Sequence, residues 1–172
     1  MRDRSSDERG TPAYIVEAAR AVMGGIDLDP ASTAEANEIV GAAHFYTKED
    51  NGLTRPWFGN VWLNPPFSVP LAEQFADKAI REIEAGRVLR MTVLVNYSTG
   101  RWFHKLLAYP GFSVGFIRHH PRHPNGRLEF YALAGNGRRM GNNGTGQVVF
   151  YCGTNPIDFL AYFGQYCTIV RT

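Results

Sequence analysis

The chain has two cysteines, no long apolar run and almost no net charge, and each of these shortages narrows what the protein can be. Cys152 and Cys167 have no CxxC spacing and the sequence does not open with a signal peptide, so we expect a reduced, cytoplasmic protein. No apolar run approaches the roughly 20 residues that a membrane-spanning helix needs, so no membrane span is expected. The net charge is only +2, so a nucleic-acid surface would depend on local clusters of basic residues.

The sequence does have enough apolar residues for one core. With 172 residues and 44% hydrophobic content, it has the size of a single domain. Residues 1–10 include charges of alternating sign, which predicts a flexible N-terminal arm. We therefore expect one domain over residues 11–172.

Hydrophobic patterning predicts helices that alternate with strands. The helices are expected at 13–23, 33–40, 71–85, 99–109 and 156–166, and the strands at 26–28, 61–63, 88–95, 112–117, 128–133 and 147–151. Thr11 is expected to cap the first helix, with Pro12 in its first position. The last helix is expected to pack Ile157, Leu160, Ala161 and Phe163 inward. The pattern predicts an α/β fold with a mostly parallel sheet, helices on both faces, and the last two strands as an antiparallel pair.

Asn64-Pro65-Pro66-Phe67, which follows the apolar run 61–63, is the most informative motif of the chain. Two prolines fix φ and remove two backbone donors, so the carbonyls of this turn can point at a ligand. Asn64 adds a side-chain acceptor. Two convergent acceptors can hold an exocyclic amine and pull its lone pair out of conjugation, while Phe67 offers a face on which the ring can stack. The alternative is a Pro-Pro turn that only ends a strand.

The tetrapeptide resembles the (Asp/Asn/Ser)-Pro-Pro-(Tyr/Phe/Trp) motif of S-adenosylmethionine-dependent amino-methyltransferases. The order of motifs is similar to that of the phage-type, Dam-like DNA N6-adenine methyltransferases. The segments that carry this resemblance are Thr11-Pro12, 28–31, 45–53, Trp57, 61–67 and 126–130, which together span most of the chain. The resemblance implies a compact Rossmann-like class I methyltransferase that methylates the N6 amine of adenine in DNA, with the target base flipped out of the duplex. The chain departs from the expected pattern in having no Gly-x-Gly cofactor loop after Asp29.

The resemblance also implies which residues surround the cofactor. S-adenosylmethionine would be bound by Thr11, Pro12, Asp29, Pro30 and Asn64. Asp29 would contact its ammonium group. Position also favours Asp29, because a doubly wound fold binds its ligand at the carboxyl ends of its strands. Asp29 could instead cap the helix that follows.

The turn Asp50-Asn51-Gly52 could add a polar contact to the same pocket, or could be a turn and nothing more.

Basic residues are concentrated after the strand predicted at 112–117. DNA phosphate contacts are predicted for Arg118, Arg122 and Arg127 in this segment, and for Arg138 and Arg139 in the glycine-rich connector at 134–146. The alternative for the first segment is a solvated loop whose charges contact nothing, and the alternative for the connector is a plain hairpin loop. His119, His120 and His123 lie in the first segment, but Pro121 and Pro124 break any helix and no cysteine or acidic ligand is adjacent, so no metal site is predicted.

The same chemistry leaves other substrates open. The amine could belong to adenine in RNA, to cytosine N4 or to a protein glutamine. Asparagine in place of serine at position 64 favours adenine over cytosine, as far as the resemblance goes. A different class of function is a DNA-binding relic of the fold that no longer turns over.

Overall fold

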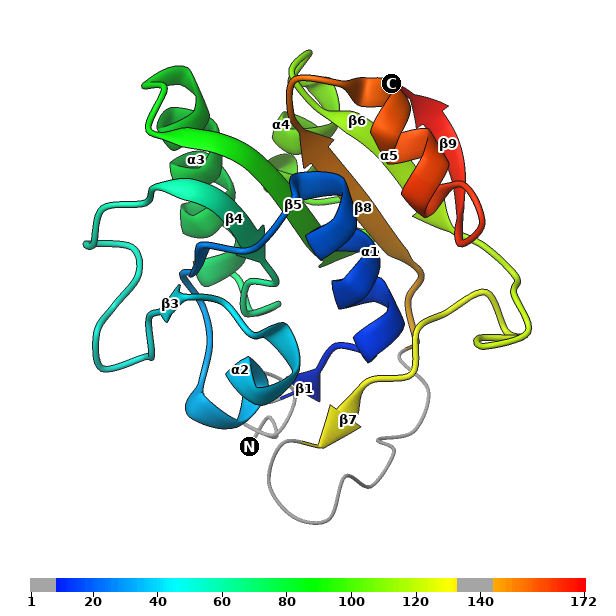
Figure 1. Cartoon of the computed structure of the whole chain (residues 1–172), viewed down its shortest axis with the longest axis horizontal. Helices are drawn as coiled ribbons and strands as arrows, with labels where there is room; N and C mark the ends of the chain where they lie inside the picture. The colour runs from blue at the N-terminus through cyan, green and yellow to red at the C-terminus, as the bar shows by residue number, and fades with distance from the viewer. Residues whose placement is uncertain (1–8, 133–143) are drawn as a thin grey trace.

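A seven-stranded sheet runs through the centre of the computed structural model, which describes residues 9–132 and 144–172 (Figure 1). Its order is β3-β2-β4-β5-β8-β6-β9. The strands are β2 (Leu28–Asp29), β3 (His44–Phe45), β4 (Gly59–Leu63), β5 (Val88–Asn96), β6 (Ser113–Ile117), β8 (Gln147–Cys152) and β9 (Cys167–Arg171).

The sheet is mixed, with its parallel part first in the chain. The pairs β2–β3, β2–β4 and β4–β5 are parallel, whereas β8 pairs antiparallel with β5 and β6, and β9 with β6. All strands of the sheet except β8 and β9 therefore run in one direction. The expected Rossmann-like class, with antiparallel strands near the C-terminus, is confirmed.

Helices cover both faces of this sheet. In Figure 1, α1 (Ala13–Met23) and α5 (Pro156–Phe163) lie in front of it, and α3 (Leu71–Glu84) and α4 (Arg101–Ala108) lie behind it. The side chains of β4 pack against the helices on both faces of the sheet. Trp62 packs into the core with α1 and α5, while Val61 and Leu63 pack with α3 and α4, because successive side chains of a strand point to opposite faces.

The ends of α1 and α2 (Ala34–Val40) follow from local chemistry, with one correction. Thr33 caps α2, its hydroxyl oxygen accepting from the Ala36 amide at 3.1 Å. Helix α1 ends at Gly24, whose φ of 77° lies in the left-handed region that favours glycine. Thr11 does not cap α1 as the sequence predicted. Pro12 occupies the cap position, and the side chain of Thr11 is used elsewhere.

Several other expectations are wrong for reasons of long-range pairing. Arg9 and Gly10, expected in a flexible arm, form β1 (Arg9–Gly10), which pairs antiparallel with β7 (Tyr131–Ala132). The predicted partnership of 128–133 with 147–151 is therefore wrong, because β8 inserts between β5 and β6 instead.

The C-terminal segment also differs from its prediction. Helix α5 ends at Phe163, and residues 167–171 form strand β9, which was not predicted; Cys167 therefore lies in a strand. In α5 the buried side chains are Phe159 and Phe163, whereas Ile157 is 70% exposed and Leu160 is 51% exposed. Every helix in the described part of the chain is too short or too polar to cross a lipid bilayer.

Candidate active site

The carboxyl ends of β2 and β4 meet at one edge of the sheet and open into a cavity. The two strands are parallel neighbours, with Leu28 opposite Val61, so Asp29 and Asn64 lie at the same edge of the sheet. The cavity has a volume of about 440 Å³. Its lining comes mainly from residues 10–11, 29–33, 47–48, 51–53 and 64–67. The fold therefore brings together segments that are far apart in sequence and that carry the motifs of the chain.

Asn64 presents one end of its side-chain amide to a neighbour and leaves the other end without a partner. Its Nδ2 donates to the hydroxyl oxygen of Thr11 at 3.1 Å. Its Oδ1 is buried and has no hydrogen-bond partner among the residues that the structure describes. A buried acceptor without a donor is unfavourable, which makes this oxygen a strong candidate for binding a ligand N–H group.

Phe67 lines the same cavity and is fixed by a second aromatic ring. Its ring packs against Phe130 at 6.2 Å between centroids, edge to face. Phe130 is 2% exposed. The segment that carries it is held in place where the Leu128 amide donates to Gln147 Oε1 at 2.8 Å. Sequence reasoning recognised the segment 126–130 but missed this support for Phe67, because the contact joins residues that are distant in the chain.

Asp29 is buried, with 2% of its surface exposed. Burial raises its pKa from 3.8 to about 7, although the Ala31 amide, which donates to Oδ1 at 3.1 Å, opposes this shift. Asp29 does not cap α2, since that role belongs to Thr33. Its hydrogen-bonding neighbours in the described part of the chain are Ala31 and Ser32, and neither is basic, so this buried carboxyl at the wall of a cavity suits a cationic ligand.

The turn at 50–52 also lines the cavity and is held by close packing. Asn51 and Gly52 both belong to the lining, and Asn51 has a φ of 57°. A methyl group on Gly52 would overlap the carbonyl oxygen of Pro30, so only glycine fits there. The Trp57 ring donates from Nε1 to the Gly52 carbonyl at 2.8 Å. This turn packs against the segment where a Gly-x-Gly loop was expected.

The predicted cofactor residues Thr11, Asp29, Pro30 and Asn64 all line the cavity, and so do Pro65, Pro66 and Phe67. Pro12 does not; its carbonyl accepts from the Ile15 amide at 3.0 Å and starts α1. Thr47 and Lys48 also line the cavity, although the sequence had given them no role.

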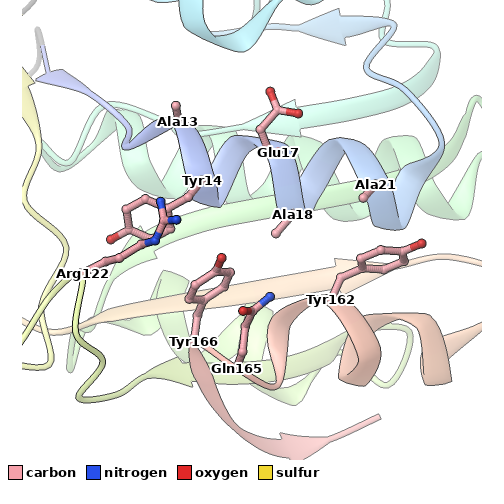
Figure 2. A pocket seen from close by; sticks show the side chains of 9 residues that line it. All are labelled: Ala13, Tyr14, Glu17, Ala18, Ala21, Arg122, Tyr162, Gln165 and Tyr166. Atoms are coloured by element: carbon pink, nitrogen blue, oxygen red, sulfur yellow. The ribbon is translucent and has the colours of Figure 1, made fainter.

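Of the predicted DNA-contacting arginines, Arg118, Arg122 and Arg127 lie outside this cavity. The loop after β6 starts at the same edge of the sheet as Asn64, because β6 runs in the direction of β4. Arg122 lines a groove between α1 and the end of α5, where its guanidinium lies over the Tyr14 ring, 5.2 Å from the centroid (Figure 2). Arg118 donates to the Gly164 carbonyl at 3.0 Å. Arg127 is exposed, and Arg138 and Arg139 lie outside the described residues.

The histidines of this loop pack with tyrosines. The His123 ring is buried, and its Nδ1 lies 2.8 Å from the Tyr14 hydroxyl. His120 and His123 stack at 5.1 Å between centroids. In the described part of the chain, no group of three His, Cys, Asp or Glu side chains is arranged to hold a metal ion.

A mixed α/β sheet whose parallel strands end in an Asn-Pro-Pro-Phe turn beside a ligand-sized cavity is the architecture of a Rossmann-like methyltransferase. Sequence comparison narrows this class. The chain belongs to the DNA N-6-adenine-methyltransferase (Dam) family, whose model matches residues 1–165. Methyltransferases of this family use S-adenosylmethionine.

A relative in Escherichia phage T1, a DNA N-6-adenine-methyltransferase, is 36% identical over 103 residues. The aligned stretch covers 59% of this chain and 41% of the phage protein, so it spans less than half of that relative. No solved structure matches the chain.

Proposed function

We propose that this chain transfers a methyl group from S-adenosylmethionine to the N6 amine of adenine in DNA. The observation that carries the proposal is the Oδ1 atom of Asn64, which is buried beside the cavity and has no partner among the described residues. Family membership supports both the adenine substrate and the cofactor.

The chemistry asked of the protein is orientation. S-adenosylmethionine supplies a methyl group that is already activated on a sulfonium, so the chain needs no nucleophile of its own. Asn64 Oδ1 and the Pro65 carbonyl accept the two amine hydrogens, which draws the nitrogen lone pair out of conjugation with the ring. Phe67, held by Phe130, stacks on the base and offsets part of the few kcal/mol needed to flip it from the duplex. Fixed acceptors of this kind act without reorganisation during the reaction.

The buried carboxyl of Asp29 receives the cofactor's ammonium group. Its burial and its raised pKa support this role, because a cation that enters the cavity satisfies a charge that burial otherwise disfavours. Of the other residues predicted around the cofactor, Thr11 and Pro30 line the same cavity, whereas Pro12 lies outside it at the start of α1.

DNA is the partner, and no metal takes part. Arg118, Arg122 and Arg127 approach its phosphates from the loop after β6, and Arg138 and Arg139 from the connector. The methyltransferase domain includes β1 and so starts before residue 11. The protein works in the cytoplasm of a bacterium or a phage-infected host, where both DNA and reduced cysteines are found. Cys152 and Cys167 are free, which agrees with that location.

The test is identification of the product. The protein is incubated with unmethylated DNA and isotope-labelled cofactor, the DNA is digested to nucleosides, and the labelled nucleoside is identified by mass spectrometry. N6-methyladenine is the expected product. Labelled N4-methylcytosine would show that the substrate is the N4 amine of cytosine and not the N6 amine of adenine. Label on RNA or protein alone would reject DNA as the substrate, and cofactor binding without any transfer would indicate a relic.

A further inference from the structure

The side-chain amide of Asn64 has two ends of similar shape and opposite hydrogen-bonding character. The proposed reaction uses only the oxygen, because an adenine amine has hydrogens to donate. If the amide turned over, its NH2 group would face that amine, donor against donor. The terminal torsion of asparagine has broad energy wells, so contacts must fix which end faces the cavity.

Thr11 supplies such a contact from a distant part of the chain. Its hydroxyl oxygen accepts from Asn64 Nδ2 at 3.1 Å across 53 positions in sequence. Thr11 is 5% exposed, so water does not compete freely for this bond. The bond occupies the NH2 end of the amide and leaves Oδ1 as the end without a partner. In the reversed amide the Thr11 hydroxyl would donate to the oxygen instead, and the NH2 group would lose the acceptor that Thr11 provides, so that two N–H donors in place of one oxygen would face the cavity.

The backbone around Thr11 is held from both sides. Gly10 pairs with Tyr131 in the β1–β7 ladder, and Pro12 begins α1. A residue that precedes proline is itself restricted to extended backbone conformations. The Thr11 hydroxyl is therefore presented to Asn64 from a fixed position.

From this geometry we infer that Thr11 is a positioning residue, which anchors the NH2 end of the Asn64 amide so that Oδ1 faces the target amine. This inference rests on the proposed function of Asn64. It differs from a direct cofactor contact by Thr11, because a positioning role changes turnover and leaves cofactor affinity nearly intact.

The first test compares Thr11→Val, which keeps the shape of the side chain and removes its hydroxyl, with Thr11→Ser, which keeps the hydroxyl. We expect Thr11→Val to lower kcat by about 10- to 100-fold, while KM for S-adenosylmethionine changes by less than about twofold. Thr11→Ser should restore kcat to within about threefold of the unmodified protein. A raised KM for the cofactor with unchanged kcat would overturn the inference in favour of direct cofactor binding. Equal kcat in all three proteins would overturn it as well.

The second test asks whether Thr11 acts through Asn64. In Asn64→Asp the side chain has two equivalent oxygens, so its orientation no longer matters. Thr11→Val should therefore lower kcat much less in the Asn64→Asp background than in the unmodified chain. An equal loss in both backgrounds would show that Thr11 acts independently of the amide.

A third measurement separates failure of the inference from failure of the proposed function, since it does not require activity. In ¹⁵N-labelled protein, the side-chain NH2 signals of Asn64 are assigned by their loss in Asn64→Asp. These protons should exchange slowly with solvent, and their exchange should quicken in Thr11→Val but not in Thr11→Ser. Identical exchange in Thr11→Val would refute the anchoring bond, whether or not the protein methylates DNA.

Discussion

Replacing Asp29 with asparagine should stabilise the protein and weaken its binding of the cofactor. The substitution keeps an oxygen that can accept from the Ala31 amide, which bonds to Oδ1 at 3.1 Å. It removes a carboxyl whose pKa burial has raised from 3.8 to about 7. Asp29→Asn therefore isolates the effect of the buried charge.

The sign of the stability effect follows from proton binding. Between about pH 4 and pH 7 the folded protein holds a proton on Asp29 that the unfolded chain has lost, so the free energy of unfolding falls as pH rises through this window. A pKa raised by about three pH units corresponds to on the order of 4 kcal/mol. Asp29→Asn should recover much of this free energy at pH 8 and little of it at pH 4.

Cofactor binding should show the opposite trend in the unmodified protein. A cation favours the ionised carboxyl, so the affinity for S-adenosylmethionine should fall about tenfold from pH 8 to pH 6. At pH 7, binding should release about half a proton per cofactor. Asp29→Asn should bind more weakly at pH 8 and should lose this pH dependence, apart from any titration of the cofactor itself.

The assay is isothermal titration calorimetry with S-adenosylmethionine in two buffers of different ionisation enthalpy, together with urea unfolding from pH 4 to pH 8. Asp77→Asn is the matched control, because its carboxylate lies at the surface, paired with Lys105 at 2.8 Å. If Asp29→Asn behaved like Asp77→Asn in both measurements, the assignment of Asp29 to the cofactor site would be wrong.

Three further changes test the packing, the buried charge and the basic loop. Gly52→Ala should destabilise the protein by several kcal/mol in urea unfolding and abolish calorimetric cofactor binding, because the added methyl meets the backbone carbonyl of Pro30. Gly144→Ala is the control, because its methyl meets no described atom, and it should change stability by less than about 0.5 kcal/mol. Glu82→Gln should lower the free energy of unfolding by a few kcal/mol, because it breaks the buried ion pair with Lys78. Glu84→Gln, at the exposed end of the same helix, should leave stability unchanged. Both variants should keep their turnover at 25 °C. Arg122→Gln should weaken DNA binding and reduce its salt slope by about one, and an unchanged slope in fluorescence anisotropy would exclude a phosphate contact.

The sequence was sufficient to predict the parts of the fold whose signals are local. Helix α1 spans the residues predicted for it, 13–23, and Thr33, the first residue of the helix predicted at 33–40, caps α2. The Asn-Pro-Pro-Phe turn was recognisable because two prolines after an apolar strand have few other uses. These features depend on residues that are close in sequence.

The predictions that were wrong or absent concern strand pairing and side-chain contacts between distant residues, which no local sequence pattern encodes. Strand β8 has the composition of a buried strand, but its position between β5 and β6 depends on side chains far away in the chain. Strand β9 was not predicted, because the apolar residues of α5 suggested a longer helix. The run Thr168-Ile169-Val170, in which every residue is β-branched, was the sequence signal that favoured a strand. The bond between Thr11 and Asn64 could not be seen from sequence, since it joins two motifs through space.

The most direct test of the central claim, that Asn64 Oδ1 receives the target amine, is single-turnover methyl transfer by Asn64→Ala. The account predicts a loss of at least about 100-fold in the rate of transfer, with S-adenosylmethionine affinity and melting temperature close to those of the unmodified protein. Asn155→Ala is the control, because it removes the cap of α5, which does not line the cavity, and should cost stability without slowing transfer. Transfer by Asn64→Ala at the rate of the unmodified protein would contradict the account.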